Sequence, residues 1–378
     1  MISRILSKEI KSCLFKKKAI ILIGARQTGK TTLLKSLIQE LNQHTLWLSG
    51  DDYNTREELG KHSISHLNSI VGNHKILVID EAQYVENIGL SIKLIVDHIP
   101  DVQVIATGSS SFDLLNSVNE PLTGRKWEFQ LFPISYDELL HENGIIKEKG
   151  LREHRLIFGS YPEVINNLGQ ERETLKLLTS SYLYKDLFMH EQLKKPQLIE
   201  KLVRALAFQV SSEVSYNELA QLIGADIQTI EKYIDLLEKA FIIFRLYGLS
   251  RNLRNEIKKS RKIYFYDNGV RNAVINNFNS LNSRNDIGAL WENYIVSERF
   301  KFTHYHKMYM NRYFWRTHSR QEIDYLEEYD GIIHAHEIKW NTKKKVKFPK
   351  SFLSAYPEST TNIINPENFN DFLSLRKE

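Results

Sequence analysis

The sequence predicts an α/β protein in three parts, on the strength of two changes of pattern along the chain. Up to about residue 130, apolar runs alternate with amphipathic segments, which is typical of a parallel sheet covered by helices on both faces. The next stretch is mostly helical in pattern, and from about residue 288 a long helix precedes further strands. Because 378 residues exceed one ordinary core, we expect domains at 1–155, 156–280 and 281–378.

The first part contains four apolar runs that we predict to be strands. They are AIILIG, TLWLSGDD, KILVIDEAQ and VQVIATGSS, and the helical patterns between them include TTLLKSLIQELN and GLSIKLIVDHI. The strand that ends in VIDE is expected to lie beside AIILIG. A βαβ alternation of this kind places loops and ligands at the carboxyl ends of the strands.

The composition is that of a globular protein with a mildly basic balance. Hydrophobic residues make up 42% and charged residues 26%, and the net charge is +5. The single cysteine, Cys13, excludes a disulfide framework and a cysteine zinc site. The N-terminus lacks a sustained apolar run and no stretch approaches about 18 apolar residues, so we expect a cytoplasmic protein with no membrane span.

Residues Gly24 to Thr31 match G-x-x-x-x-G-K-[ST] at every fixed position, between a predicted strand and a predicted helix. In such a loop the backbone N–H groups and the helix N-terminus attract phosphates. Lys30 is expected to reach the β- and γ-phosphates of ATP, and Thr31 to place its hydroxyl on Mg²⁺. The predicted nucleotide-binding residues are Gly24, Ala25, Arg26, Gln27, Thr28, Gly29, Lys30, Thr31, Thr32 and Asp80.

Two acids end the strand KILVIDE, where the ligand of an open parallel sheet binds. Asp80 is expected to hold Mg²⁺ with Thr31, and Glu81 is the expected base that orients the attacking water. An acidic pair after a strand can also cap a helix, but the phosphate loop favours the nucleotide role.

Polar residues that could sense or stabilise the γ-phosphate follow in the next segments. Thr107 and Ser109 end the strand VQVIATGSS, and the sequence does not choose between them as the sensor. Arg125, in LTGRKWEF, is a candidate for the arginine that stabilises transition-state charge, from its own or a neighbouring subunit. The alternatives are a serine-rich turn and a solvated surface arginine.

Residues 215–265 have the outline of a winged helix, with two helices followed by a strand pair. Gly224 is predicted to end the first helix in a left-handed conformation, and Asp226 to cap the second. The intervening basic loop has one acid, Glu256, and could neutralise DNA phosphates, although such domains also dock proteins. Its cations are Arg251, Arg254, Lys258, Lys259, Arg261 and Lys262.

The last part carries acids and a lysine in the pattern E…D…E-x-K, from Glu292 to Lys339. Glu337 and Lys339 share a strand face, and Asp324 joins them if the two strands are neighbours. Glu322 shares the face of Asp324 and could assist. Carboxylates so grouped suit Mg²⁺, and the lysine could activate water, while charged residues on solvent-facing strands remain the alternative. The predicted second metal site comprises Glu292, Asp324, Glu337 and Lys339, and the lysines that follow are Lys343, Lys344, Lys345, Lys347 and Lys350.

The last pattern resembles the PD-(D/E)XK, or restriction-endonuclease-like, superfamily, and ATGSS resembles the sensor strand of AAA-type ATPases. The whole chain resembles a group of prokaryotic AAA-type ATPases with a C-terminal region made of a winged helix and a nuclease-like fold. The stretches that carry the resemblance are GARQTGKTTLL, VIDEAQ, ATGSSSFDLL, LTGRKWEFQLFPISYDEL, GSYPEV, YFYDNGVRNAV, GALWENYIVSE, EIDYL and EIKW. The resemblance implies ATP binding and a homo-oligomer such as a hexamer.

These features lead us to expect a Mg²⁺-dependent ATPase that acts on DNA as an oligomer. One rival is a metal-dependent nuclease that ATP switches on. A second rival is a signalling ATPase whose C-terminal region binds a protein partner. The sequence does not identify the DNA structure, the oligomer size or the pathway.

Overall fold

The computed structural model divides the chain into two compact units, and each is described by itself. Residues 1–133 with 239–241 form the first unit, and residues 134–238 with 242–378 form the second. The structure describes residues 2–109, 118, 121–188, 195–249, 261–317, 319–343 and 346–375. The three-part division expected from the sequence stays a prediction.

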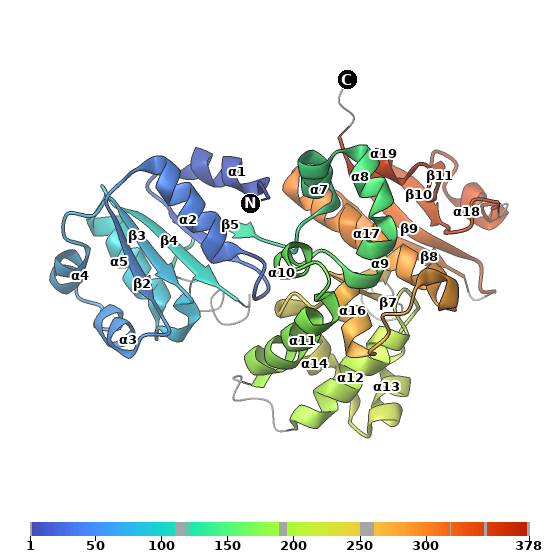
Figure 1. Cartoon of the computed structure of the whole chain (residues 1–378), viewed down its shortest axis with the longest axis horizontal. Coiled ribbons are helices and arrows are strands. Elements are labelled where there is room, and N and C mark those ends of the chain that lie inside the picture. Colours follow the sequence, from blue (N-terminus) through green and yellow to red (C-terminus); the bar gives the residue numbers. More distant parts are fainter. Residues whose placement is uncertain are drawn as a thin grey trace. The chain divides into compact units, whose positions relative to one another are not determined.

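The first unit contains a five-stranded parallel sheet in the order β2-β3-β4-β1-β5 (Figure 1). The central strands are fully buried apolar runs, whereas the edge strands are partly exposed. The expectation that the VIDE strand lies beside the first strand is wrong, because β4 pairs with both of them. The strands are β1 (Ala19–Ile23), β2 (Thr45–Ser49), β3 (Ile76–Asp80), β4 (Gln103–Gly108) and β5 (Lys126–Gln130).

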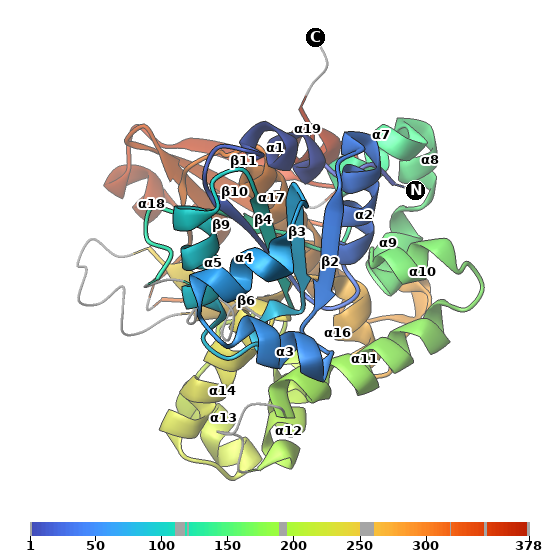
Figure 2. The same ribbon diagram turned by 90° about the vertical axis from the view of Figure 1, so that its left-hand side faces the viewer.

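Helices cover both faces of this sheet for a topological reason. The chain runs from β1 outward to β2, then returns through β3 to β4, and right-handed crossovers in opposite directions place their helices on opposite faces. Figure 2 shows α2 on one side of the sheet and α4 and α5 on the other. The helices of this unit are α1 (Leu6–Cys13), α2 (Lys30–Leu41), α3 (Tyr53–Leu59), α4 (Ile64–Val71), the 3₁₀ turn η1 (Ala82–Tyr84) and α5 (Ile88–His98).

The second unit begins with a series of helices. Ser135 and Glu138 form a capping box at the start of the first one, with each side chain bonded to the backbone N–H of the other. No described helix of the chain is long and apolar enough to cross a membrane. The helices are α7 (Tyr136–Asn143), α8 (Ile145–Gly150), α9 (Arg152–Phe158), α10 (Pro162–Asn166), α11 (Glu171–Phe188), α12 (Pro196–Phe208), α13 (Tyr216–Ile223) and α14 (Ile227–Lys239).

The predicted turn between α13 and α14 is confirmed. Gly224 follows α13 with φ 77°, in the left-handed region. Asp226 accepts a hydrogen bond from the Thr229 backbone N–H at 2.8 Å and so caps α14. The expected strand pair follows as β6 (Ile243–Gly248) and β7 (Arg261–Phe265), which are antiparallel.

These two strands belong to a six-stranded sheet in the order β11-β10-β9-β8-β6-β7. β6 pairs in parallel with β8, so the sheet continues across the boundary expected near residue 280. The last elements are α16 (Asn268–Val274), η2 (Leu281–Ser283), α17 (Ile287–Tyr305), β8 (Asn311–Arg316), β9 (Glu322–Tyr329), β10 (Ile332–Ile338), α18 (Lys350–Ala355), β11 (Thr360–Ile364) and α19 (Phe369–Leu373).

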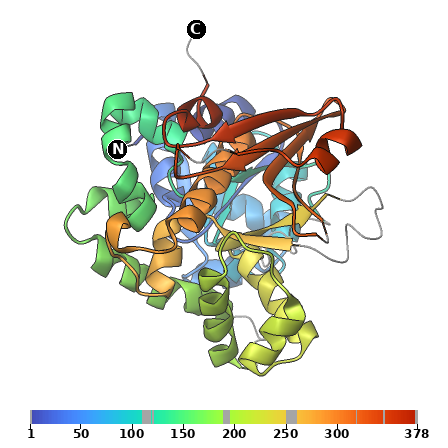
Figure 3. The same ribbon diagram turned by 90° about the vertical axis from the view of Figure 1, so that its right-hand side faces the viewer.

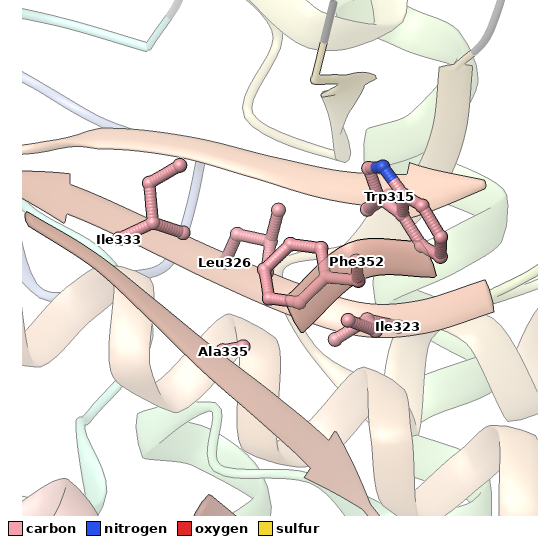
Figure 4. Close-up of a cluster of buried hydrophobic side chains, with 6 residues drawn as sticks. All are labelled: Trp315, Ile323, Leu326, Ile333, Ala335 and Phe352. Carbon is pink, nitrogen blue, oxygen red and sulfur yellow. The ribbon is translucent and has the colours of Figure 1, made fainter. Parts of the chain in front are cut away.

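The two faces of this sheet are covered by different helices. Leu326 of β9 packs in a buried apolar cluster with Phe352 of α18 (Figure 4). The next residue, Glu327, pairs with Arg299 of α17 at 2.7 Å, and successive strand residues face opposite sides. α17 therefore covers the face opposite α18 (Figure 3). The cluster comprises Trp315, Ile323, Leu326, Ile333, Ala335 and Phe352.

Candidate functional site

The loop between β1 and α2 is curled tightly against the neighbouring strand. Leu131, just after β5, donates its backbone N–H to the Ile23 carbonyl at 2.8 Å. A Cβ on Gly24 would lie 2.1 Å from the Leu131 oxygen, so only glycine allows this approach. Gln27 and Gly29 have positive φ angles of 57° and 93°. The loop thus leaves the sheet at the carboxyl end of β1 and turns directly into α2, as the phosphate-loop motif predicts.

The lysine and an unpredicted arginine hold the loop from two sides. Lys30 is 5% exposed and donates to the Gly24 and Ala25 carbonyls at 2.9 and 3.0 Å. Arg4 is buried and donates to the carbonyls of Thr28 and Phe132 at 2.8 and 2.7 Å. Sequence reasoning missed Arg4, because no motif links it to a loop 24 residues further along the chain. These two hydrogen bonds to main-chain carbonyls hold the Lys30 ammonium against the loop that is expected to bind phosphate.

Asp80 accepts hydrogen bonds from two hydroxyls. Thr31 donates to one carboxylate oxygen at 3.0 Å, and Thr107 donates to the other. Thr107 also accepts the backbone N–H of Glu81 at 3.1 Å. Three of the predicted site residues therefore meet at the carboxyl edge of β3 and β4. Of the two sensor candidates, Thr107 is the one in contact with Asp80.

Glu81 is held by a residue for which the sequence assigned no role. Gln83 donates from its side-chain amide to the Glu81 carboxylate at 2.6 Å and to the Ser109 hydroxyl at 3.2 Å. The sequence could have indicated this role, because Gln83 lies in VIDEAQ, two residues after Glu81. Glu81 itself has φ 51°, an uncommon left-handed conformation that turns the chain sharply after β3.

The two predicted arginines have other partners in the structure. Arg125 donates to the Asp97 carboxylate at 2.7 Å, and its carbonyl accepts the Ala19 N–H at 2.9 Å. It therefore lies beside the amino end of β1, whereas the phosphate loop follows the carboxyl end, at least about 10 Å along the strand. Arg125 and the phosphate loop therefore lie at opposite ends of β1, and the role of Arg125 at the phosphate stays a prediction. Arg26 donates to the Tyr84 hydroxyl at 2.8 Å.

The residues at this edge fit a magnesium–nucleotide complex. Mg²⁺ in such sites keeps waters and takes one or two protein oxygens together with substrate phosphates, so it needs no dedicated cage. Asp80 and Thr31 supply a carboxylate and a hydroxyl within 3.0 Å of each other. Among the described residues, no group of three or more His, Cys, Asp or Glu side chains is arranged to hold a metal ion by itself.

The acids and lysine predicted near the C-terminus also come together. β9 and β10 are antiparallel neighbours, which meets the condition under which Asp324 joins Glu337 and Lys339. Lys339 donates to Asp324 and lies at the same distance, 2.6 Å, from Glu337, while Asp324 also accepts the Ile338 N–H at 2.8 Å. Proximity to Asp324 adds to burial in raising the pKa of Glu337 to about 7.

Glu292 joins this group through Lys262, which the sequence analysis assigned to a loop. Lys262, expected on an exposed basic loop, lies in β7 and is 1% exposed. Its ammonium is 3.1 Å from Glu292 and 2.6 Å from Glu322. Tyr264, two residues further along β7, donates to Glu292 at 2.8 Å. We call Lys262, Glu292, Glu322, Asp324, Glu337 and Lys339 the carboxylate–lysine cluster.

The remaining predicted cations divide between exposed and undescribed positions. Lys343, Lys347 and Lys350 are exposed. Arg261 stacks on Tyr216, with its guanidinium 4.0 Å from the ring centre. Outside the described residues lie the stretch SFDLL and Arg251, Arg254, Glu256, Lys258, Lys259, Lys344 and Lys345.

Two further stretches of the resemblance form a buried structural contact. Asp267 accepts the backbone N–H groups of Ser160 at 2.7 Å and Val270 at 3.1 Å. Gly159 has φ 70°, and a Cβ there would lie 2.1 Å from the Asp267 carboxylate. Burial raises the pKa of Asp267, against the opposing effect of Lys301. The contact of Gly159 and Ser160 with Asp267 therefore gives GSYPEV and YFYDNG a structural role.

Comparison with known proteins divides the chain into three matched segments. Residues 16–140 match the family described as an AAA domain. Residues 149–281 and 287–374 match two families described as domains of unknown function, DUF8612 and DUF4143.

Similar whole chains include uncharacterised proteins of two bacteria. One, from Haemophilus influenzae, is 23% identical over 275 residues, which is 68% of each chain. Another, from Mycobacterium tuberculosis, is 23% identical over 338 residues, covering 87% of this chain and 72% of its own.

Two solved structures can be compared with the chain. A Walker-type ATPase of Pyrococcus abyssi has a TM-score of 0.49 at 16% identity, covering 73% of this chain and 96% of its own. The RuvB Holliday junction branch migration motor of Thermotoga maritima has a TM-score of 0.33 at 17% identity, covering 69% and 92%. On the family match and the parallel sheet with its phosphate loop, residues 16–140 form an AAA-type ATPase domain.

Proposed function

We propose that this chain is a Mg²⁺-dependent ATPase that binds DNA and changes its structure, acting as a homo-oligomer. The observation that carries the ATPase proposal is the meeting of Thr31, Asp80, Thr107 and Glu81 beside the phosphate loop. This edge of the sheet offers anion donors, a metal-binding carboxylate and a base within one hydrogen-bonded group.

Each residue has a defined task in this proposal. Lys30 moves from the loop carbonyls to the β- and γ-phosphates, and the loop N–H groups bind their oxygens. Asp80 and Thr31 hold Mg²⁺, which neutralises phosphate charge. Glu81 accepts the proton of the attacking water, and Gln83 fixes the orientation of the Glu81 carboxylate. Thr107 bonds both the Asp80 carboxylate and the backbone N–H of Glu81. Release of phosphate from the metal that Asp80 holds therefore changes the position of Glu81.

DNA is the proposed ligand because of the exposed lysines that follow the EIKW strand. Lys343, Lys347 and Lys350 are exposed within a stretch that has no acid between Lys339 and Lys350. Such clusters neutralise phosphates and release counterions, which makes binding depend steeply on salt. For Arg125, which lies beside the amino end of β1, we propose a role at the site of a neighbouring subunit of this homo-oligomer.

The test is the ATP hydrolysis rate against a panel of single-stranded, duplex, forked and four-way-junction DNA. We expect at least one DNA structure to raise the hydrolysis rate. In the Lys30→Ala and Glu81→Gln proteins, no DNA structure should produce this rise. Replacing Lys343, Lys347 and Lys350 together by glutamine should weaken DNA binding and reduce its salt dependence, while the rate without DNA stays unchanged. A rate that no DNA alters, together with no DNA binding at low salt, would exclude DNA and favour a protein partner.

A further inference from the structure

The carboxylate–lysine cluster contains more positive charge than its sequence pattern requires. The pattern E…D…E-x-K has one lysine, Lys339, which binds Asp324 and Glu337. The structure adds Lys262, from a strand outside the pattern, between Glu292 and Glu322. Four carboxylates are thus divided into two pairs, and each pair holds one ammonium group.

The position of Lys262 is that of an interior cation. Its side chain is 1% exposed, and its ammonium lies 5.5 Å from the ring centre of Phe314, a fully buried residue of β8. A lysine so buried stays charged only when acids surround it. The charges of Glu292, Asp324 and Glu322 raise the pKa of Lys262 although burial lowers it, so this group remains an ammonium.

Glu292 is held beside the Lys262 ammonium by a second hydrogen-bond donor, Tyr264. One of its carboxylate oxygens accepts both Lys262 and the hydroxyl of Tyr264. Glu322 is held by Lys262 at 2.6 Å and lies 3.7 Å from Arg316, which itself pairs with Glu213 at 2.8 Å. Both carboxylates therefore face donors from β7 and β8, and a divalent cation would have to displace a buried ammonium to reach them.

We propose that Lys262 is a built-in cation that takes the place of a divalent metal at Glu292 and Glu322, and so confines any metal in the cluster to Asp324 and Glu337. Lys262 is a positioning residue, because it is too deeply buried to touch DNA. The consequence for function is that a two-metal mechanism, which needs two divalent cations about 4 Å apart, is closed to the native chain.

The test counts the Mn²⁺ ions bound by the full chain without nucleotide, from the electron paramagnetic resonance signal of free Mn²⁺. Replacing the ammonium by an uncharged chain of similar length, Lys262→Met, should add one bound Mn²⁺ relative to the wild type. Adding Glu292→Gln to this variant should remove the gained ion. Lys147→Met, at an exposed lysine of α8 that has no role in either proposal, is the matched control and should leave the count unchanged.

A second variant keeps the proposal open to contradiction if Lys262→Met does not fold. Glu292→Gln in the otherwise native chain should leave the Mn²⁺ count at the wild-type value, since Glu292 already has its cation. A lower count in this variant would overturn the proposal, as would a folded Lys262→Met protein that binds no additional ion. The outcome is independent of ATP hydrolysis, so it can fail while the proposed ATPase function stands.

Discussion

The phosphate-loop edge of the first unit and the carboxylate–lysine cluster of the second use the same residue types in different partnerships. At the loop, Lys30 binds main-chain carbonyls and Asp80 binds hydroxyls. In the cluster, Lys262 and Lys339 bind the carboxylates themselves. In the first arrangement the described bonds of the cation and of the acid go to neutral groups, whereas in the second the lysines and the carboxylates bind each other.

This difference shows that an acid near a lysine is insufficient evidence for a metal site. What decides is which partner the lysine has when no ligand is bound. A lysine on neutral carbonyls exchanges them for phosphate readily, while a buried lysine between carboxylates is held by charge that water does not screen. The predictions below test whether the two regions differ in this way.

The largest expected effect concerns the base at the loop edge. Glu81→Gln keeps the size of the side chain and removes its ability to accept a proton. General-base catalysis contributes about 10²–10⁴-fold, so the hydrolysis rate should fall by that factor while ATP binding persists. Steady-state hydrolysis and equilibrium binding of ATP measure the two separately. A Glu81→Gln protein that hydrolyses ATP at the wild-type rate would remove Glu81 from the mechanism.

The next effect is on folding stability, and it separates the two lysines. Above about pH 7, where Glu292 is ionised, Lys262→Met leaves this largely buried carboxylate and the partly exposed Glu322 without their cation, which typically destabilises by about 3–5 kcal/mol. Lys30→Ala removes hydrogen bonds to the Gly24 and Ala25 carbonyls, and we expect a smaller loss of about 1 kcal/mol. Urea unfolding of both variants, followed by circular dichroism, provides the measurement. Equal losses would contradict the contrast between the two regions.

The cluster also predicts a dependence of folding stability on pH. Burial raises the pKa of Glu292 to about 7, against the lowering by Lys262. The folded state then holds a proton that the unfolded state releases near pH 4.5, so the free energy of unfolding falls as pH rises from about 4.5 to 7. The shift corresponds to about 3 kcal/mol.

Glu292→Gln should make this decline shallower while the contribution of Glu337, whose pKa is raised in the same range, remains, and Glu358→Gln, at an exposed position, should leave the whole decline in place. Urea unfolding at closely spaced pH values between 4 and 8 gives the curve. If the Glu292→Gln curve has the same slope as the wild type, Glu292 is ionised throughout and the proposed proton is absent.

A smaller effect distinguishes the two hydroxyls after β4. Thr107→Val removes the donor to Asp80 and the acceptor for the Glu81 N–H, and one hydrogen bond of about 1.4 kcal/mol corresponds to about tenfold in rate. Ser109→Ala should change the rate less, because Ser109 contacts only Gln83 in this group. The reverse order of the two variants would make Ser109 the sensor.

The smallest effect on stability is expected for Arg125→Ala. Its ion pair with Asp97 is 42% and 29% exposed, and exposed pairs contribute at most about 1 kcal/mol. If Arg125→Ala lowers the hydrolysis rate by more than this small loss of stability explains, Arg125 acts at the site of a neighbouring subunit. Mixing Arg125→Ala with Lys30→Ala protein should restore activity, since each supplies what the other lacks. Mixtures as inactive as the separate variants would exclude a role in trans.

Local features of this fold were predictable from the sequence, and long-range ones were not. The phosphate loop and the cap at Asp226 follow from spacing and turn chemistry within short segments, whereas the sequence leaves the pairing of β9 with β10 open. The insertion of β4 between β1 and β3 depends on packing between distant segments, which alternation of strands and helices does not encode.

Lys262 and Arg4 show the same limit in the candidate sites. Lys262 stands at the end of a basic run, so composition placed it in a loop, although it alternates with Tyr264 on one face of a strand. Its partners lie 30 and 60 residues further along the chain. Arg4 similarly reaches the phosphate loop across 24 residues. No spacing rule connects such positions.

The contrast between the two regions is tested most directly by counting metal ions in both at once. The full chain is loaded with a non-hydrolysable ATP analogue, freed of excess nucleotide and titrated with Mn²⁺. We predict that loading adds one Mn²⁺, that Asp80→Asn removes this ion, and that Glu292→Gln leaves the total unchanged. An ion count that Asp80→Asn leaves intact, or that Glu292→Gln lowers, would contradict the assignment of the metal to the phosphate-loop edge and of Lys262 to the cluster.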